Sequence, residues 1–346
     1  MTTFRVALSG DFKKPDGSPA YPMFDLGLLE DASDIEISYV DPVDGRMSSD
    51  SLAGFDALIL LAPVFDKESI PSDGRLSVVA RFGVGYDTVD VQACTDAGIA
   101  VCITPDGVRR PVAVTILTFL LALSGKLFDK DRLTREGAEG FKKRPHYMGM
   151  GLVGRTLGSI GIGNIGAEAY RMAAPLQMRH IAHDPYCDPE VAKSIGVELV
   201  GLETLFKESD YLCVNTPLTE DTRHIVNAES LALMKPTAYL INTSRGPTVD
   251  QPALVNALRD GTIAGAGLDV LDPEPPSTDD PILALDNVIV TPHALCWTDQ
   301  CFAGIGASDI KQVLMVRNGE VPLHLVDKSV ADSEIFQARL QAYVSS

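Results

Sequence analysis

Six short apolar runs recur between residues 157 and 292, and they constrain the fold more than any other feature of the chain. In order they are LGSIGIG, MRHIAHD, YLCVN, AYLIN, AGAGLDV and NVIVTP. Segments with a helical pattern separate them, and strands that alternate with helices form a parallel sheet with helices packed on its faces. Six such strands are the number found in a full dinucleotide-binding sheet. The sequence therefore predicts an α/β fold that includes a Rossmann-type domain.

The first hundred residues show the same alternation and predict a second α/β lobe with a parallel sheet. Its strand-like runs include RVALS, ALILLA, SVVARF and IAVCIT. A chain of 346 residues is also long enough for two domains of about 150 residues each. We expect the chain to cross at TPDGVRRP and to return through a helix in CFAGIGASDIKQVLMVRNGE. The predicted domains are a discontinuous substrate-binding domain, 1–104 and 299–346, and a nucleotide-binding domain, 105–298.

Composition limits the partners. The chain has 29 Lys and Arg against 47 Asp and Glu, a net charge of −18, which repels nucleic acid and anionic lipid. The six cysteines show no C-x-x-C spacing and no neighbouring histidines, so we predict no disulfide framework and no metal site. Buried thiols in a reducing cytosol, and a start that reads as a strand instead of a signal peptide, predict a cytoplasmic protein.

The longest apolar run is VAVTILTFLLAL at 112–123, with 12 residues. A membrane-spanning helix needs about 20 apolar residues, so we predict a packed helix in the core or at a subunit interface. The charged stretch that follows, DKDRLTREGAEGFKKRP, is typical of solvated surface.

A glycine motif follows the first of the six runs. Gly161, Gly163 and Gly166 form G-x-G-x-x-G between an apolar strand and a helical pattern, where glycines allow a tight turn and let the backbone approach a pyrophosphate at the helix N-terminus. Asp184 ends the next run, 18 residues after Gly166. A carboxylate there binds ribose hydroxyls and repels the extra phosphate of NADP, so NAD is the predicted cofactor. The alternative is a turn or cap residue before Pro185.

The later strands also end in residues that can do chemistry. YLCVN leads to Thr216 and Pro217, AYLIN to Arg245, AGAGL to Asp269 and NVIVTP to His293. Because ligands of open α/β sheets bind at the carboxyl ends of the strands, we expect these residues to converge on one site.

Their chemistry suggests roles. Arg245 can grip a carboxylate and polarise a neighbouring keto oxygen through its planar fork of donors. Glu274, in DPEPP, would pair with His293, favour the imidazolium and fix its orientation. His293 could then protonate the carbonyl oxygen during hydride transfer, or remove the hydroxyl proton in reverse. Asp269 is placed to accept from the nicotinamide amide. The alternatives are a surface ion pair for Arg245, a loop charge for Glu274, a helix cap for Asp269 and a structural histidine.

In these motifs the chain resembles the D-isomer-specific 2-hydroxyacid dehydrogenase family, especially its glyoxylate/hydroxypyruvate reductase-like members, over most of its length. The motifs are RFGVGYDTVD, TPDGVRRPVA, GSIGIGNIG, VNTPLTEDTRHIVN, LINTSRGPTVDQPALVNAL, GAGLDVLDPEPP and TPH. The resemblance implies a flavodoxin-like substrate domain beside the Rossmann domain, both with parallel sheets. It implies a catalytic set of Arg245, Glu274 and His293, with the amides around Val84 and Gly85 holding the substrate carboxylate.

The resemblance also implies the cofactor contacts. They are Gly161, Gly163, Asn164, Ile165, Gly166, Asp184, Thr216, Pro217, Thr243 and Asp269. It implies a homodimer through the nucleotide-binding domains, with the helix at 112–123 taking part. Formate dehydrogenases look similar but place glutamine at position 274, so Glu274 favours a 2-hydroxy acid substrate.

The chain departs from the family in two places. A glutamate common at the start of the long helix is absent from VAV at 112–114, and bulky residues follow the histidine in ALCWT. Trp297 is interpreted as a substrate-binding wall, with packing at the domain interface as the alternative. Arg109 and Arg110 could attract a second acidic group of the substrate, although a salt-bridged pair is the stronger interpretation. Glyoxylate, hydroxypyruvate and larger 2-keto acids all remain open as substrates.

The predicted function is NAD-dependent interconversion of a D-2-hydroxy acid and its 2-keto acid. One alternative is an NAD-sensing regulatory module, which shares fold and triad; the acidic composition and the lack of a basic patch or long disordered tail disfavour it. A second alternative is a dehydrogenase of a small acid such as phosphite or formate, which Glu274 and the apolar ALCW segment disfavour.

Overall fold

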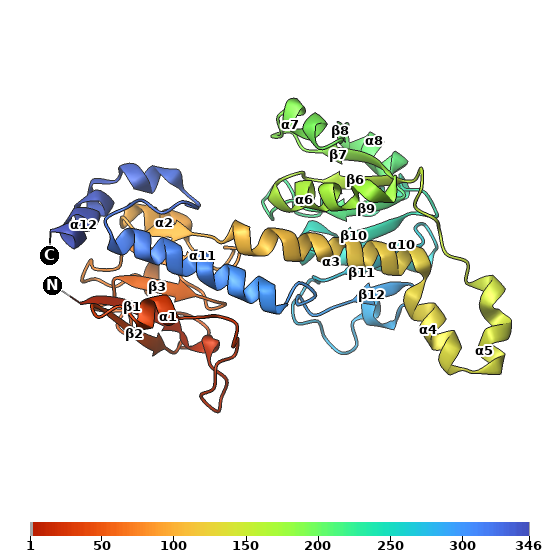
Figure 1. The fold of residues 1–346 in the computed structure, drawn as a ribbon. Helices are drawn as coiled ribbons and strands as arrows, with labels where there is room; N and C mark the ends of the chain where they lie inside the picture. The colour runs from red at the N-terminus through yellow and green to blue at the C-terminus, as the bar shows by residue number, and fades with distance from the viewer. Residues whose placement is uncertain (1–2, 346) are drawn as a thin grey trace. The chain divides into compact units, whose positions relative to one another are not determined.

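A computed structural model describes residues 3–345 as two compact units (Figure 1). Unit 1 comprises the chain through Val108 and again from Trp297 onward, and unit 2 is Arg109–Cys296. The chain therefore leaves unit 1 once and returns to it once. The assignment of substrate to one domain and nucleotide to the other stays a prediction at this point.

Unit 1 contains a five-stranded sheet whose strands are all parallel. The strands are β1 (Phe4–Ser9), β2 (Ile35–Val40), β3 (Ala57–Leu60), β4 (Val78–Arg81) and β5 (Ala100–Cys102). Their order, β2-β1-β3-β4-β5, is the flavodoxin-like order that the family resemblance implies. The helices of this unit are α1 (Gly27–Glu30), α2 (Val91–Asp96), α11 (Asp299–Arg317) and α12 (Glu334–Val344). The predicted return helix is α11, and α12 was not predicted.

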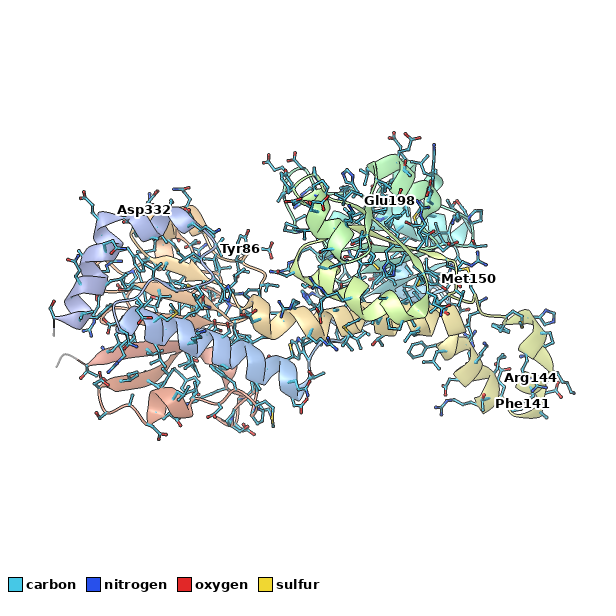
Figure 2. The ribbon with its side chains drawn as sticks, turned by 45° about the horizontal axis from the view of Figure 1, so that its top comes forward. Tyr86, Phe141, Arg144, Met150, Glu198 and Asp332 are labelled. Atoms are coloured by element: carbon cyan, nitrogen blue, oxygen red, sulfur yellow. The ribbon has the colours of Figure 1, made fainter. Side chains whose placement is uncertain are left out.

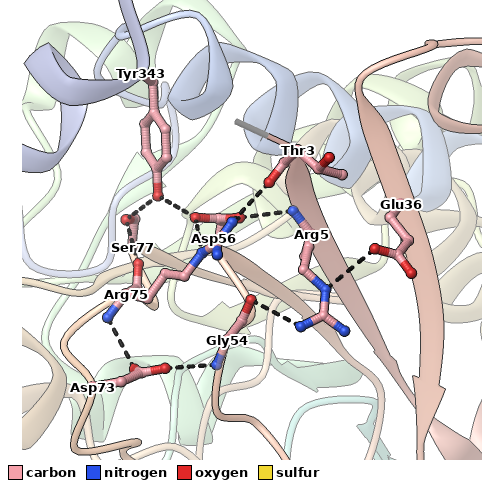
Figure 3. Close-up of polar contacts among 9 residues, drawn as sticks. All are labelled: Thr3, Arg5, Glu36, Gly54, Asp56, Asp73, Arg75, Ser77 and Tyr343. Carbon is pink, nitrogen blue, oxygen red and sulfur yellow. Dashed lines mark hydrogen bonds and ion pairs between the residues drawn. The ribbon is translucent and has the colours of Figure 1, made fainter. Parts of the chain in front are cut away.

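A buried carboxylate ties the two ends of the chain together in unit 1 (Figure 3). Asp56 is 2% exposed and accepts hydrogen bonds from the Arg5 amide at 2.7 Å and from two nitrogens of Arg75 at 2.8 and 2.7 Å. It also accepts from the Tyr343 hydroxyl of α12 at 3.1 Å, and Ser77 lies 2.8 Å from that hydroxyl. The C-terminal helix is thus hydrogen bonded to the N-terminal sheet.

Unit 2 contains a seven-stranded parallel sheet with the order β12-β11-β10-β9-β6-β7-β8. The strands are β6 (Thr156–Ile160), β7 (Arg179–His183), β8 (Glu198–Leu199), β9 (Tyr211–Val214), β10 (Tyr239–Asn242), β11 (Gly265–Leu268) and β12 (Val288–Val290). All six predicted strands are confirmed, and the two-residue β8 is additional. The order reverses direction between β6 and β9, which is where sheets of this kind bind dinucleotides.

Helices cover both faces of this sheet. They are the C-terminal part of α3 (Pro105–Gly125), α6 (Asn164–Ala173), α7 (Pro189–Ser194), α8 (Leu202–Glu208), α9 (Ala228–Ala232) and α10 (Gln251–Arg259), whereas α4 (Leu127–Arg135) and α5 (Ala138–Lys143) lie away from the sheet. Buried apolar side chains form one cluster on each face; Leu240 and Ala266 belong to one, and Tyr211 and Ile241 to the other.

The long apolar helix α3 packs against the sheet of unit 2. Phe119 of α3 is buried against Gly267 of β11. A Cβ on Gly267 would lie 2.6 Å from the Phe119 ring, so glycine allows the helix to approach the strand this closely. Within residues 3–345, α3 is the one helix long and apolar enough to cross a membrane, and 56% of its most apolar window is buried. Its opposite face exposes Val114 and Leu121, at 45% and 51%.

The charged stretch after α3 forms the helices α4 and α5, which project from the sheet. Exposed ion pairs within the stretch join Arg135 to Asp131 and Lys142 to Glu139. Figure 2 shows the side chains of this arm, among them Phe141, which is exposed and lies under the Arg144 guanidinium. The arm is solvated surface, as predicted.

Candidate active site

The glycine motif forms the turn between β6 and α6. Gly161 has a φ of 87°, and a Cβ at this position would lie 2.8 Å from the Asn215 carbonyl oxygen, so the turn requires glycine. Its amide donates to the His183 carbonyl at 2.8 Å. Gly163 is the N-cap of α6, and the helix begins at Asn164. The N-terminus of a ten-residue helix therefore faces the carboxyl edge of the sheet at the strand-order reversal, where it can bind an anion.

Asp184 is fastened to the glycine turn. One of its carboxylate oxygens accepts from the Ile162 amide at 2.9 Å, and the other accepts from the Tyr186 amide at 2.9 Å. The bond from the Tyr186 amide is the turn interaction given above as the alternative for Asp184. Asp184 therefore bonds to the glycine turn and also within its own turn. Its position beside the turn is the one that a ribose-binding carboxylate requires.

A cavity of about 300 Å³ opens beside Asp184. Its lining residues are His183, Asp184, Pro185, Leu199, Val200 and Gly201. The residues after β8 were not predicted as part of a site, because a two-residue strand leaves no periodic signal in the sequence.

Two threonines complete this edge. A Cβ on Gly161 would lie 3.3 Å from the Thr216 amide nitrogen, so Thr216, which follows β9, borders the glycine turn. The Thr243 hydroxyl, after β10, is buried and has no hydrogen-bond partner among the described residues. A buried hydroxyl without a partner costs free energy unless a ligand satisfies it. The orphaned hydroxyl, the glycine turn and the carboxylate together fit a dinucleotide.

His293 follows β12 in a left-handed backbone conformation, with a φ of 53°. Non-glycine residues in this region are strained and gather at functional sites. Its Nδ1 lies 2.9 Å from one oxygen of Glu274, whose other oxygen accepts from the Leu271 amide at 2.9 Å. The predicted Glu274–His293 pair is therefore present in the structure.

The pKa of Glu274 is lowered. Burial acts to raise it, but the hydrogen bonds from His293 and Leu271 and the positive charges of His293 and Arg245 outweigh burial. Glu274 is thus ionised at neutral pH and accepts a hydrogen bond from the Nδ1–H of His293. That tautomer leaves Nε2 as the ring nitrogen available for proton exchange with a substrate.

Arg245 follows β10 and lies close enough to Glu274 for its charge to lower the pKa of that carboxyl. A Cβ on the next residue, Gly246, would lie 1.8 Å from the Leu271 carbonyl oxygen, so the Arg245 loop packs directly on the Glu274 loop. One guanidinium nitrogen donates to the Ser244 carbonyl at 2.7 Å. The three predicted catalytic residues converge, although each belongs to a different loop.

Asp269 anchors the loop that carries His293. It is 4% exposed, and its Oδ1 accepts from the Thr291 hydroxyl at 2.5 Å and from the amides of Ala294 and Leu295 at 3.1 and 3.2 Å. No helix begins at Asp269, so it is not a helix cap here. The sequence analysis missed this contact and the part taken by Thr291. The predicted bond to a nicotinamide amide stays a prediction.

The loop proposed to hold the substrate carboxylate follows β4 in unit 1. Gly83, with a φ of 130°, is clamped by Thr104, which donates its amide to the Gly83 carbonyl at 2.9 Å and accepts the Gly83 amide at its hydroxyl at 3.0 Å. Val84 and Gly85 are half-buried, and the exposed Tyr86 follows (Figure 2).

Three further residues singled out from the sequence have defined surroundings. Arg110 forms an ion pair with Glu168 at 2.7 Å, in agreement with the salt-bridge interpretation. Arg109 forms no such ion pair within residues 3–345, and its charge contributes to the lowered pKa of Glu168 after Arg110 and burial. Trp297 belongs to unit 1, is 52% exposed and contacts aromatic rings of that unit.

Known proteins are similar to this chain in sequence and in fold. The sequence model of the family described as "D-isomer specific 2-hydroxyacid dehydrogenase, NAD binding domain" matches residues 117–294. A glyoxylate reductase from Korarchaeum cryptofilum is 38% identical over 309 residues, 89% of this chain and 91% of that protein. One from Thermococcus onnurineus is 39% identical over 80% of this chain and 84% of its own length. The crystal structure of a glyoxylate reductase from Paecilomyes thermophila superposes with a TM-score of 0.80 at 27% identity, covering 95% of this chain and 100% of that one.

Proposed function

The chain belongs to the D-isomer-specific 2-hydroxyacid dehydrogenase family, and on that premise we propose how its own residues perform the reaction. It is an NAD-dependent oxidoreductase that interconverts a 2-hydroxy acid and the corresponding 2-keto acid. The observation that carries the assignment of roles is the Glu274–His293 hydrogen bond beside Arg245, at the strand ends that also carry the glycine turn.

His293 is the acid and base. In reduction, its Nε2 donates a proton to the keto oxygen, and in oxidation the same atom removes the hydroxyl proton. Glu274 remains ionised, holds the Nδ1 hydrogen and stabilises the imidazolium. Arg245 binds the substrate carboxylate and keto oxygen through its paired donors, which orients the carbonyl and stabilises charge on its oxygen. In unit 1, the backbone amides around Val84 and Gly85 would bind the substrate carboxylate.

NAD, when bound, supplies or accepts the hydride. The glycine turn and the N-terminus of α6 would hold its pyrophosphate, and Asp184 would hold the adenosine ribose. Thr216, which borders the turn, and Pro217 would contact the cofactor, and the buried Thr243 hydroxyl would gain a partner. Because the Asp184 carboxylate would repel a ribose phosphate, NAD is preferred over NADP.

The protein acts as a cytoplasmic homodimer, without nucleic acid or membrane partners. The exposed apolar side chains of α3, Val114 and Leu121, supply an apolar surface in unit 2 that a second copy can cover. The net charge of −18 opposes binding to phosphate backbones and anionic lipid.

The test follows NADH absorbance while the purified protein receives a panel of 2-keto acids of increasing size, with NADPH in parallel. We expect reduction of at least one of them, with NADH preferred. His293→Ala should lower kcat by about 100- to 10,000-fold, the contribution of a general acid, while NADH still binds. His224→Ala is the matched control, since His224 is also exposed and also has a φ of 53°.

NADH binding without turnover of any 2-keto acid would refute the enzymatic proposal and favour the NAD-sensing module. Normal turnover per folded molecule in His293→Ala would refute the assignment of the proton donor alone.

A further inference from the structure

A carboxyl group lies in the buried face of α11, the helix that packs on β4 in unit 1. Asp309 is 0% exposed, and neither of its carboxyl oxygens has a hydrogen-bond partner within residues 3–345. Ile305 and Val313, one turn away on the same face of the helix, are buried as well. A helix face of this kind normally carries apolar side chains, and a buried polar group normally has a partner, so Asp309 needs an explanation.

A second polar residue of the same face shows the contrast. Gln312 is 1% exposed, donates to the Ile103 carbonyl at 3.0 Å and accepts from the His324 amide at 3.0 Å. Both ends of its side-chain amide are therefore satisfied, as is usual for a buried polar group. The unsatisfied carboxyl of Asp309 is thus a property of that residue and not of the whole helix face.

The surroundings of Asp309 favour its uncharged form. Burial raises the pKa of its carboxyl well above the usual range, and the positive charge of Arg81, at the end of β4, acts in the opposite direction. Cys102 of β5 is fully buried, and burial and the charge of Asp309 raise the pKa of its thiol. The helix α12 also packs on α11, and its Arg339 donates to two backbone carbonyls at 2.7 Å each.

Arg81 lies against the loop assigned to the substrate carboxylate, residues 82–85, which we call the substrate loop. Its guanidinium donates to the Phe82 carbonyl, and a Cβ on Gly83 would lie 2.9 Å from its Nη1. Phe82 and Gly83 directly precede the amides of Val84 and Gly85. The position of the Arg81 side chain therefore affects the backbone that would bind the substrate.

Loss of the Asp309 proton would change this arrangement. An ionised carboxylate without a partner is costly in a fully buried position. A guanidinium binds a carboxylate more strongly than it binds a neutral carbonyl, and the charge of Arg81 already acts on Asp309. Ionisation would therefore draw the guanidinium toward Asp309 and away from the Phe82 carbonyl.

We propose that Asp309 is a positioning residue whose protonation controls the substrate loop. While the carboxyl keeps its proton, Arg81 holds the Phe82 carbonyl and the loop binds the substrate carboxylate. When the proton passes to solvent, Arg81 moves to the Asp309 carboxylate and the loop binds the substrate less tightly. This inference rests on the proposed function, and it gives unit 1 a response to pH that is separate from proton exchange at His293.

The first test detects the buried proton without turnover. Wild type and Asp309→Asn, which has a side chain of the same size and no charge, are unfolded in urea between about pH 5 and about pH 8. Because the pKa of Asp309 is raised in the folded protein, the stability present below the unfolded pKa is lost as the pH rises toward the folded pKa. We expect the unfolding equilibrium constant of wild type, relative to that of the variant, to rise by about tenfold per pH unit. The control Asp96→Asn, which changes an exposed carboxylate of α2, should show no such trend.

The second test measures KM and kcat for a 2-keto acid that the protein reduces, at saturating NADH, from about pH 6 to about pH 9. His293 titrates in wild type and in Asp309→Asn alike, so the ratio of their KM values isolates the effect of Asp309. We expect the ratio of wild-type KM to variant KM to rise from about one to about ten, the effect of weakening one hydrogen bond to a charged group, with little change in the ratio of kcat values. In an Arg81→Gln background, which removes the cation, the KM ratio should stay near one at every pH.

Asp309→Leu also removes the charge and serves in both tests if Asp309→Asn does not fold. A stability difference that does not change with pH would overturn the inference, because Asp309 would then hold no buried proton. A constant KM ratio, or the same rise in the Arg81→Gln background, would also overturn it and leave the proposed function intact. Failure to reduce any 2-keto acid would instead refute the proposed function and this inference with it.

Discussion

Replacing Glu274 by Gln removes the negative charge from the pair with His293 and keeps the size of the side chain. The charge lies 2.9 Å from Nδ1, and the two side chains are 38% and 45% exposed, so the dielectric constant of water is the appropriate one. Coulomb's law then gives about 1.4 kcal/mol for the interaction of the carboxylate with the imidazolium. That free energy corresponds to about one pH unit.

The sign follows from the lowered pKa of Glu274. The interaction with His293 that keeps a proton off the carboxyl also keeps a proton on the imidazole, since the two effects are one interaction free energy. Reduction of the keto acid needs that proton. In Glu274→Gln, the pH above which reduction declines should therefore fall by about one unit, and kcat should fall as well because Gln has one acceptor oxygen for two donors.

The assay is the pH profile of kcat/KM for reduction, measured with NADH in wild type and variant. Asp279→Asn is the control, since it removes an exposed carboxylate from the same loop without contact to His293. A lower rate with an unshifted profile would show that Glu274 only orients the imidazole. An equal shift in Asp279→Asn would show a general charge effect, and either result would refute the reasoning.

Two further predictions concern the cofactor and the fold. Asp184→Asn should lower the ratio of kcat/KM with NADH to kcat/KM with NADPH by about tenfold, because it removes the charge that repels a ribose phosphate. The variant keeps an acceptor for the Ile162 amide. An unchanged ratio would contradict the role of Asp184. Asp56→Ala should lower the free energy of unfolding by about 2–3 kcal/mol, measured in urea, because it removes the buried acceptor of the Arg5 amide and of the partly exposed Arg75. The control is the exposed Asp73→Ala, for which a loss of about 1 kcal/mol or less is expected, and an equal loss in both variants would refute the argument.

The parts of the fold that follow from sequence are those with a long apolar pattern. All six strands predicted for unit 2 are confirmed, because buried parallel strands form continuous apolar runs. The edge strand β2 (Ile35–Val40) has no continuous apolar run, and it was missed although its alternation of apolar and polar residues is typical of a half-buried strand. The strand β8 has only two residues, which leave no pattern. Strand order, which decides the neighbours of each loop, carries no local signal.

In the site, too, some contacts of single residues could be predicted from the sequence and others could not. Glu274 and His293 could be paired in advance because an acidic and a basic side chain attract each other, and both residue types stand out in the sequence. The bonds of Asp269 could not, since two of its three donors are backbone amides of Ala294 and Leu295, and a backbone amide is the same in every residue.

The contacts of Asp269 also explain how a strained histidine persists in a fixed position. A left-handed backbone costs about 1–3 kcal/mol in a residue with a side chain, and His293 must keep it in every turnover. Three hydrogen bonds to one oxygen of a buried carboxylate hold the residues on both sides of His293, and such bonds are worth about 1.5–3 kcal/mol each. Because all three fall on Oδ1, the proposed contact with the nicotinamide amide would fall to Oδ2. One carboxylate would then position the proposed proton donor with one oxygen and the nicotinamide with the other.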